Sequence, residues 1–168
     1  MILSIEHEEP NRTLAILVEI VAEELNIVLR RAGSTTFKRE DLLKGFEPGS
    51  CFYIQNSAAV HGKKRIDLSV DPPPDLVIEI DVTSASLPRF PIFAAVGVPE
   101  VWRYDGEAVQ VFKLADGKYV EVETSVALPP LTGAVATRFL KENETVNSSA
   151  WLRRVPAWVR EQPGNISD

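Results

Sequence analysis

The chain has 168 residues, of which 45% are hydrophobic and 25% are charged, and its formal net charge at pH 7 is -6. This length and composition are typical of one globular domain, so we expect a single domain over residues 1–168. The negative charge argues against wholesale attraction to nucleic acid or to an anionic membrane. One cysteine, Cys51, excludes a disulfide framework, and we find neither an apolar run long enough to span a membrane nor a signal peptide. We therefore expect a cytoplasmic protein.

The first predicted element is an amphipathic helix from about Glu9 to Ala32. Its apolar residues recur at helical spacing, at Leu14, Leu17, Val18, Val21 and Leu25. Pro10 suits the first turn of such a helix, and Gly33 is expected to end it.

Strands and a short helix are predicted in the middle of the chain. The strands are expected over Thr35–Lys38, Cys51–Gln55 and Leu76–Val82. After them, Ser86 and Pro88 are suited to begin a short helix, and Gly97 is suited to end it.

The rest of the chain reads as strands followed by helices. A strand is expected over Val101–Tyr104, and Asp-Gly pairs at 105–106 and 116–117 are hairpin signals around the runs Ala108–Leu114 and Tyr119–Val126. Helices are expected at Ala134–Lys141 and Ala150–Glu161. This order of elements predicts an α/β or α+β domain with a mixed central sheet and helices on its faces.

The strand at Leu76–Val82 carries acids on one face only. Side chains alternate along a strand, so Leu76, Ile78 and Ile80 point to one side, and Asp75, Glu79 and Asp81 to the other. Glu79 and Asp81 are about 6.6 Å apart along the strand, within reach of one hard metal ion, whereas Asp75 lies about 13 Å from Glu79. The alternative is that these acids are solvated or paired with Lys and Arg.

Other polar and aromatic residues have two readings each. The basic segment His61–Arg65 and the residues Arg153, Arg154 and Arg160 form either exposed surface or phosphate sites. His7 either serves a bound phosphate or a neighbouring acid, or shapes the start of the helix together with Glu8. The aromatic residues on the predicted strands either stack on bases or belong to the core; these are Phe52, Tyr53, Trp102 and Tyr104.

Several segments in succession resemble one family. They are His7-Glu8, Gly33–Thr36, Phe46–Ile54, Pro74–Glu79 and Gly97–Trp102, and the last two in tandem are the most specific. Together they resemble the Uma-two family of restriction-endonuclease-like proteins, which is assigned to the PD-(D/E)XK nuclease superfamily. The resemblance covers nearly the whole chain. It implies a restriction-endonuclease-like sheet flanked by helices, DNA as the partner, and phosphodiester cleavage that depends on Mg²⁺ or Mn²⁺. Glu79 matches the family's metal-binding Glu.

The chain departs from the family pattern at three places. Gly49 stands where similar members carry an Asp, and Asp81 stands where the superfamily places a Lys. Pro88 and Arg89 stand where many relatives carry an Asp and a Lys; Arg89 keeps a charge for phosphate but is not a base. Asp75 also matches a family position, and it replaces the missing Asp only if the strand bends sharply after Pro72–Pro74.

Two main functions follow from this pattern. The first is a magnesium-dependent endonuclease with Glu79 and Asp81 as metal ligands, Asp75 as a further catalytic candidate, and Arg89 or Lys63 holding phosphate. The second is a non-catalytic nucleic-acid-binding or oligomeric scaffold protein that keeps the nuclease fold. A small-molecule binder is a third alternative. By analogy with nucleases that cut two strands, we expect a homodimer formed through exposed apolar residues near Trp102 or on the C-terminal helices.

Overall fold

The computed structural model describes residues 5–33, 37, 48–82 and 89–164. Within them, the elements in chain order are α1 (Ile5–Glu24), β1 (Arg30–Arg31), β2 (Ser50–Tyr53), a 3-10 turn η1 (Ala58–Val60), β3 (Leu76–Ile80), α2 (Phe90–Val96), β4 (Glu100–Tyr104), β5 (Val109–Ala115), β6 (Lys118–Val122), α3 (Gly133–Thr145) and α4 (Ser148–Arg160). The expected α/β architecture with a mixed sheet is confirmed.

The six strands form one sheet in the order β1-β2-β3-β4-β5-β6. β3 and β4 run parallel, because α2 carries the chain from the end of one back to the start of the next. The other neighbouring strands are antiparallel. β3, the strand with the acids, therefore lies inside the sheet, between β2 and β4.

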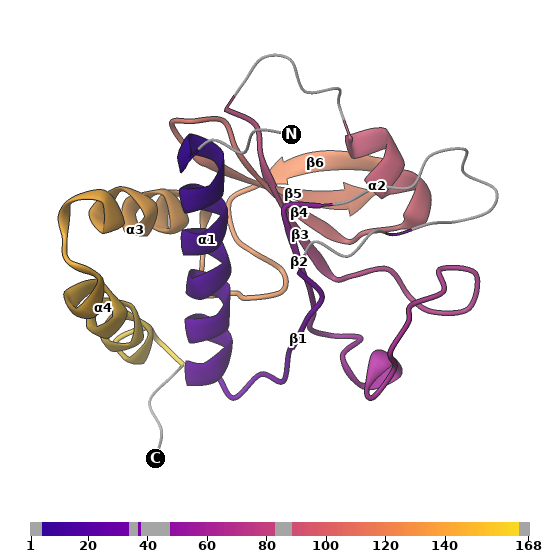
Figure 1. Cartoon of the computed structure of the whole chain (residues 1–168), viewed down its shortest axis with the longest axis horizontal. Helices are drawn as coiled ribbons and strands as arrows, with labels where there is room; N and C mark the ends of the chain where they lie inside the picture. The colour runs from indigo at the N-terminus through magenta and orange to yellow at the C-terminus, as the bar shows by residue number, and fades with distance from the viewer. Residues whose placement is uncertain (1–4, 34–36, 38–47, 83–88, 165–168) are drawn as a thin grey trace.

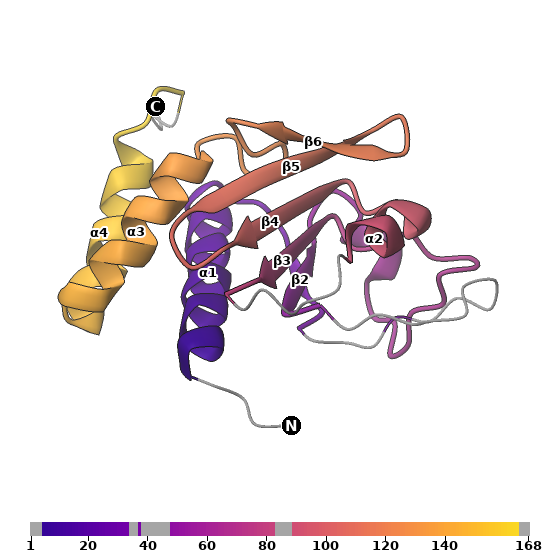
Figure 2. The same ribbon diagram turned by 90° about the horizontal axis from the view of Figure 1, so that it is seen from above.

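Helices cover both faces of the sheet. Figure 1 shows α1, α3 and α4 on one side and α2 on the other, and Figure 2 shows the same division from above. The larger core lies under α1, α3 and α4 and includes Leu76, Ile78 and Ile80. The smaller core lies under α2, where Phe93 packs with Val77 of β3. β3 is thus apolar on both faces up to Ile78, as expected for a strand inside a covered sheet.

The first helix differs from its prediction at both ends. It begins at Ile5 and ends at Glu24, so Pro10 lies inside the helix and Gly33 does not end it. The end comes at Asn26, which takes a left-handed φ of 55°, while the N–H of Ile27 bonds the carbonyl of Ala22 at 2.9 Å. Asn tolerates this conformation, so it closes the helix where glycine was expected.

The remaining predicted elements are found with shifted ends. α2 ends as expected at Gly97, which has a φ of 82°. The predicted strand at Thr35–Lys38 lies outside the described residues except for Phe37, an isolated bridge residue that is 2% exposed. Ser86 and Pro88 also lie outside them. β1 and η1 had no counterpart in the prediction.

The strand aromatic residues belong to the core. Phe52, Tyr53, Trp102 and Tyr104 are each at most 4% exposed. They are therefore closed to base stacking, and Trp102 does not contribute to a dimer surface. On the C-terminal helices, Leu152 is 45% exposed.

The structure offers no membrane-crossing element. None of the helices in the described ranges combines the length and the apolar character that a membrane span needs.

Candidate functional site

Glu79 lies near the end of β3 on the face opposite Ile78 and Ile80. Those two isoleucines are buried in the larger core, whereas the Glu79 side chain is 15% exposed. Its register partner on β4 is Arg103, and Arg89, at the start of α2, brings its Nη1 atom to 3.9 Å from Glu79 Oε1. The sheet and α2 therefore place the Glu79 carboxyl group beside the Arg89 guanidinium group.

The Glu79 carboxyl group is only partly satisfied. Its Oε1 atom is buried and has no hydrogen-bond partner within the described part of the chain. Burial raises the pKa of Glu79 to about 7, against the opposing effects of Arg89 and of the Gly49 N–H group, while nearby Asp81 raises it further. Close to neutral pH, this carboxyl group is present in both protonation states.

Asp81 is bound to an arginine. Its Oδ2 atom accepts hydrogen bonds from Arg103 Nε at 3.1 Å and from Arg103 Nη2 at 2.7 Å. Arg103 also donates from Nη1 to Gln110 on β5, at 3.2 Å. Asp81 therefore forms an ion pair with Arg103 of β4 through two hydrogen bonds, and Gln110 of β5 holds the same arginine. A metal ion bound there would compete with a guanidinium group.

Asp75 lies at the opposite end of β3 from Glu79. It is 2% exposed and accepts hydrogen bonds from the N–H groups of Ile54 and Asn56, at 2.7 and 2.9 Å, and from the Asn56 side chain at 2.9 Å. These contacts fix the chain as it leaves β2. The structure does not bring Asp75 to Glu79, and we leave it out of the site.

Gly49 precedes β2 and lies beside the end of β3. Ser50 is the register partner of Ile78, so the segment around Gly49 lies beside the strand that carries Glu79. However, a Cβ atom on Gly49 would lie 3.0 Å from Asn11 Oδ1 and 3.0 Å from the Ile78 carbonyl oxygen. A side chain at this position would thus point toward Asn11 and the Ile78 carbonyl, and it is the Gly49 N–H group that reaches the Glu79 carboxylate.

Asn11 of α1 fills the space beside Gly49. Its side-chain amide donates to the Gly49 carbonyl at 3.1 Å, and its Oδ1 accepts from Ser50 Oγ at 2.9 Å. Asn11 is 7% exposed, and sequence reasoning missed it. Its spacing could have indicated burial, because Asn11 lies three residues before Leu14 and therefore on the buried face of the helix.

The other sequence candidates make no contact with Glu79 within the described part of the chain. The Lys63 amine bonds Asp71. This pair lies toward the end of β2 at which Asp75 is also found. His7 lies one helical turn before Asn11, and its Nδ1 atom is buried without a hydrogen-bond partner among the described residues. Glu47 and Pro88 are outside those residues. Of the four catalytic candidates, the structure thus groups Glu79, Asp81 and Arg89 at one end of β3.

A further buried acid, Glu100, was not anticipated. It begins β4 and is 1% exposed. Its oxygens accept from Trp102 Nε1 at 3.1 Å, from Ser125 Oγ at 2.8 Å and from the Val126 N–H. Burial raises the pKa of Glu100, and these hydrogen bonds oppose the rise. Glu100 is tied into the fold and faces no ligand space.

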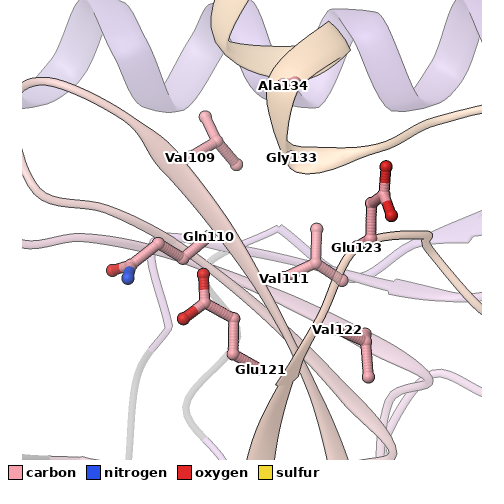
Figure 3. A pocket seen from close by; sticks show the side chains of 8 residues that line it. All are labelled: Val109, Gln110, Val111, Glu121, Val122, Glu123, Gly133 and Ala134. Atoms are coloured by element: carbon pink, nitrogen blue, oxygen red, sulfur yellow. The ribbon is translucent and has the colours of Figure 1, made fainter.

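A separate pocket of about 450 Å³ lies between β5, β6 and the start of α3. Figure 3 shows Glu121 and Glu123 on its wall, together with Gln110 and the valines of the two strands. It contains none of the residues predicted for the site. Two acids on an open surface are an ordinary solvated arrangement, so we do not assign this pocket to the site.

The donor set at Glu79 does not fit Mg²⁺ or Mn²⁺. These ions require oxygen ligands, and the free ligand here is one carboxylate oxygen that lies next to a guanidinium group. Asp81 is committed to Arg103, and Gly49 supplies no side chain. Over the described ranges, no group of three or more His, Cys, Asp and Glu side chains is placed to hold a metal ion.

Comparison with known proteins gives one family. Residues 2–142 match the model of the Uma2 family, which is described as "Putative restriction endonuclease". The matched region includes α1, the whole sheet and the Glu79 site. No curated protein matches the chain.

Proposed function

Because the chain belongs to the Uma2 family of restriction-endonuclease-like proteins, we propose that it binds DNA through the Glu79 site without metal-dependent cleavage. Family membership supports DNA as the partner. The observation that carries the loss of cleavage is the set of neighbours around Glu79, where arginines and a glycine stand in place of further acidic ligands.

The arginines are suited to the phosphate backbone. Arg89 is half-exposed, with 45% of its side chain accessible, and its planar guanidinium group matches the geometry of phosphate oxygens. Arg103 is held by Asp81 and Gln110, and the Asp81 carboxylate balances its charge. In this proposal Arg89 contacts a phosphate directly, and Arg103 offsets the repulsion between Asp81 and that phosphate.

The Glu79 carboxyl group does not prevent a phosphate from binding at this site. With a pKa of about 7, it is partly protonated near neutral pH, and a protonated carboxyl group donates a hydrogen bond to a phosphate oxygen. Protonation also removes the repulsion between a carboxylate and the phosphate. The site therefore accepts an anion without a metal ion to neutralise Glu79.

A metal-dependent endonuclease is the second candidate. The free Glu79 oxygen favours it, because Mg²⁺ is often held by one or two carboxylates together with substrate phosphates. Such an enzyme would use Glu79 as the ligand from this chain, and Asp81 only after release from Arg103.

DNA binding measured by fluorescence anisotropy tests the proposal. We expect the wild-type protein to bind a short labelled duplex at low salt in EDTA, with no gain in affinity when millimolar Mg²⁺ is added. Arg89→Gln should weaken this binding, whereas Arg138→Gln on α3 should not. Absence of wild-type binding would contradict the proposed function, and a strict requirement for Mg²⁺ would favour the endonuclease.

A further inference from the structure

A basic hollow of about 680 Å³ lies at the end of β2 away from Glu79. It is lined by Val28, Leu29, Arg30, Ser57, His61, Gly62, Lys63 and Lys64. Four of these residues carry basic side chains, and none is acidic. The whole chain has a net charge of -6, so the hollow is a basic region on an acidic protein.

The loop that forms the hollow is held in one shape. The Arg30 guanidinium group donates from Nη1 to the Val60 carbonyl and from Nη2 to the Lys63 carbonyl. The N–H of His61 bonds the Ala58 carbonyl at 3.3 Å, and Gly62 turns the chain with a φ of 74°. The basic side chains are thus presented by a fixed backbone, which lowers the entropy cost of binding.

The positive charge of the hollow is only partly compensated. Lys63 is paired with Asp71, and outside the hollow Arg31 is paired with Glu19 at 2.5 Å. Lys64 and the adjoining Arg65 are exposed and form no ion pair with any residue in the described ranges. The Arg30 guanidinium is bound to carbonyl groups, which leave its charge in place.

The shape and chemistry of the hollow fit a sugar-phosphate backbone. Lys64 and Arg65 provide exposed cations for phosphate oxygens. Val28 is 75% exposed on the wall and offers an apolar contact for a sugar. The hollow and the Glu79 site lie toward opposite ends of β3, so they are two separate surfaces.

We propose that the basic hollow formed by Arg30, His61, Lys63 and Lys64, with the adjoining Arg65, is a second contact surface for the phosphodiester backbone of DNA. This inference rests on the proposed function, because it takes DNA as the partner. It adds a binding surface that is separate from the Glu79 site.

The test compares two double variants that remove the same charge. Lys64→Gln/Arg65→Gln changes the hollow, and Arg153→Gln/Arg154→Gln changes an exposed pair on α4. All four positions are exposed, so both variants should fold, which circular dichroism checks. Binding of a short labelled duplex is measured by fluorescence anisotropy over a range of salt concentrations.

We expect the hollow variant to bind about tenfold more weakly at low salt, and its slope of log K against log salt to be smaller by about 1.8 than that of the wild type. The α4 variant should keep the wild-type slope. Equal slopes for the hollow variant and the wild type would overturn the inference while leaving the proposed function intact. An equal loss in both variants would also overturn it, since the effect would then follow net charge. If the wild type does not bind DNA at all, both proposals fail.

Discussion

At the scale of single residues, Glu79 determines the character of the site. It is a largely buried acid with one unsatisfied oxygen, and its neighbours are the Arg89 guanidinium group, a backbone N–H and Asp81, which is itself bound to Arg103. The alternation of β3 placed Glu79 correctly on the face opposite Ile78. Its environment was not predictable in the same way, because it depends on Arg103 and Asn11, which reach the site only through the register of β4 and the packing of α1.

Stability should depend on pH through Glu79. Its pKa is raised from 4.5 to about 7 in the folded protein, so the folded state holds a proton that the unfolded state releases. This proton stabilises the folded state fully below pH 4.5. The stabilisation, on the order of 3 kcal/mol, is lost as the pH rises to about 7. Glu79→Gln should remove this dependence.

Urea unfolding at pH 5 and at pH 8 measures the effect. The wild type should lose more stability than Glu79→Gln between the two pH values, and the exposed control Glu121→Gln should behave like the wild type. Glu100 titrates in all three proteins, so the comparison isolates Glu79. Parallel pH profiles for the wild type and Glu79→Gln would show that Glu79 is not a buried acid.

Gly49→Asp should not create a metal site. The new Cβ would lie 3.0 Å from two oxygens, Asn11 Oδ1 and the Ile78 carbonyl, so a carboxylate there meets crowding and repulsion. We expect a loss of about 1–3 kcal/mol in urea unfolding and no gain in Mg²⁺ affinity by calorimetry. Gly49→Ala adds the same Cβ without the charge, so it separates crowding from repulsion. Stronger Mg²⁺ binding by Gly49→Asp would reverse our interpretation of this position.

At the scale of elements, what was predictable followed local chemistry. The two-residue period of β3, the Gly97 stop of α2 and the Asp-Gly turns beside β5 identified those elements. The first helix was predicted too long because Asn26, and not Gly33, takes the left-handed conformation that ends it. β1 has only two residues, and its pairing with β2 leaves no periodic signal in the sequence.

Asp75 should affect the fold rather than the site. Its carboxylate accepts three hydrogen bonds, from Ile54 and Asn56, that hold the chain leaving β2. Asp75→Ala leaves one buried and two partly buried donors without this acceptor, and we expect a loss of about 2–4 kcal/mol in urea unfolding. Asp75→Asn keeps one acceptor oxygen and should cost less. A direct role in the site would instead appear as weaker DNA binding by a variant of unchanged stability.

At the scale of the whole molecule, the two apolar cores lie on the two faces of the sheet, and two charged regions lie toward the ends of its strands. α1, α3 and α4 bury one face and α2 buries the other (Figure 2). The polar groups described above lie toward the ends of β2 and β3. Glu79 with its arginines lies at one end of β3, and Asp75 and the basic hollow lie toward the other. The acidic chain therefore has two local regions with basic side chains, both formed by residues distant in sequence.

The central claim is that the family fold is kept here without metal-dependent cleavage. Nicking of supercoiled plasmid in millimolar Mg²⁺ or Mn²⁺, measured side by side for the wild type and Glu79→Gln, tests it most directly. We predict that the two proteins give the same background rate, because the nearby acid Asp81 is bound to Arg103 and is not free to join Glu79 as a metal ligand. A metal-dependent rate in the wild type that disappears in Glu79→Gln would contradict the claim and establish the protein as an endonuclease.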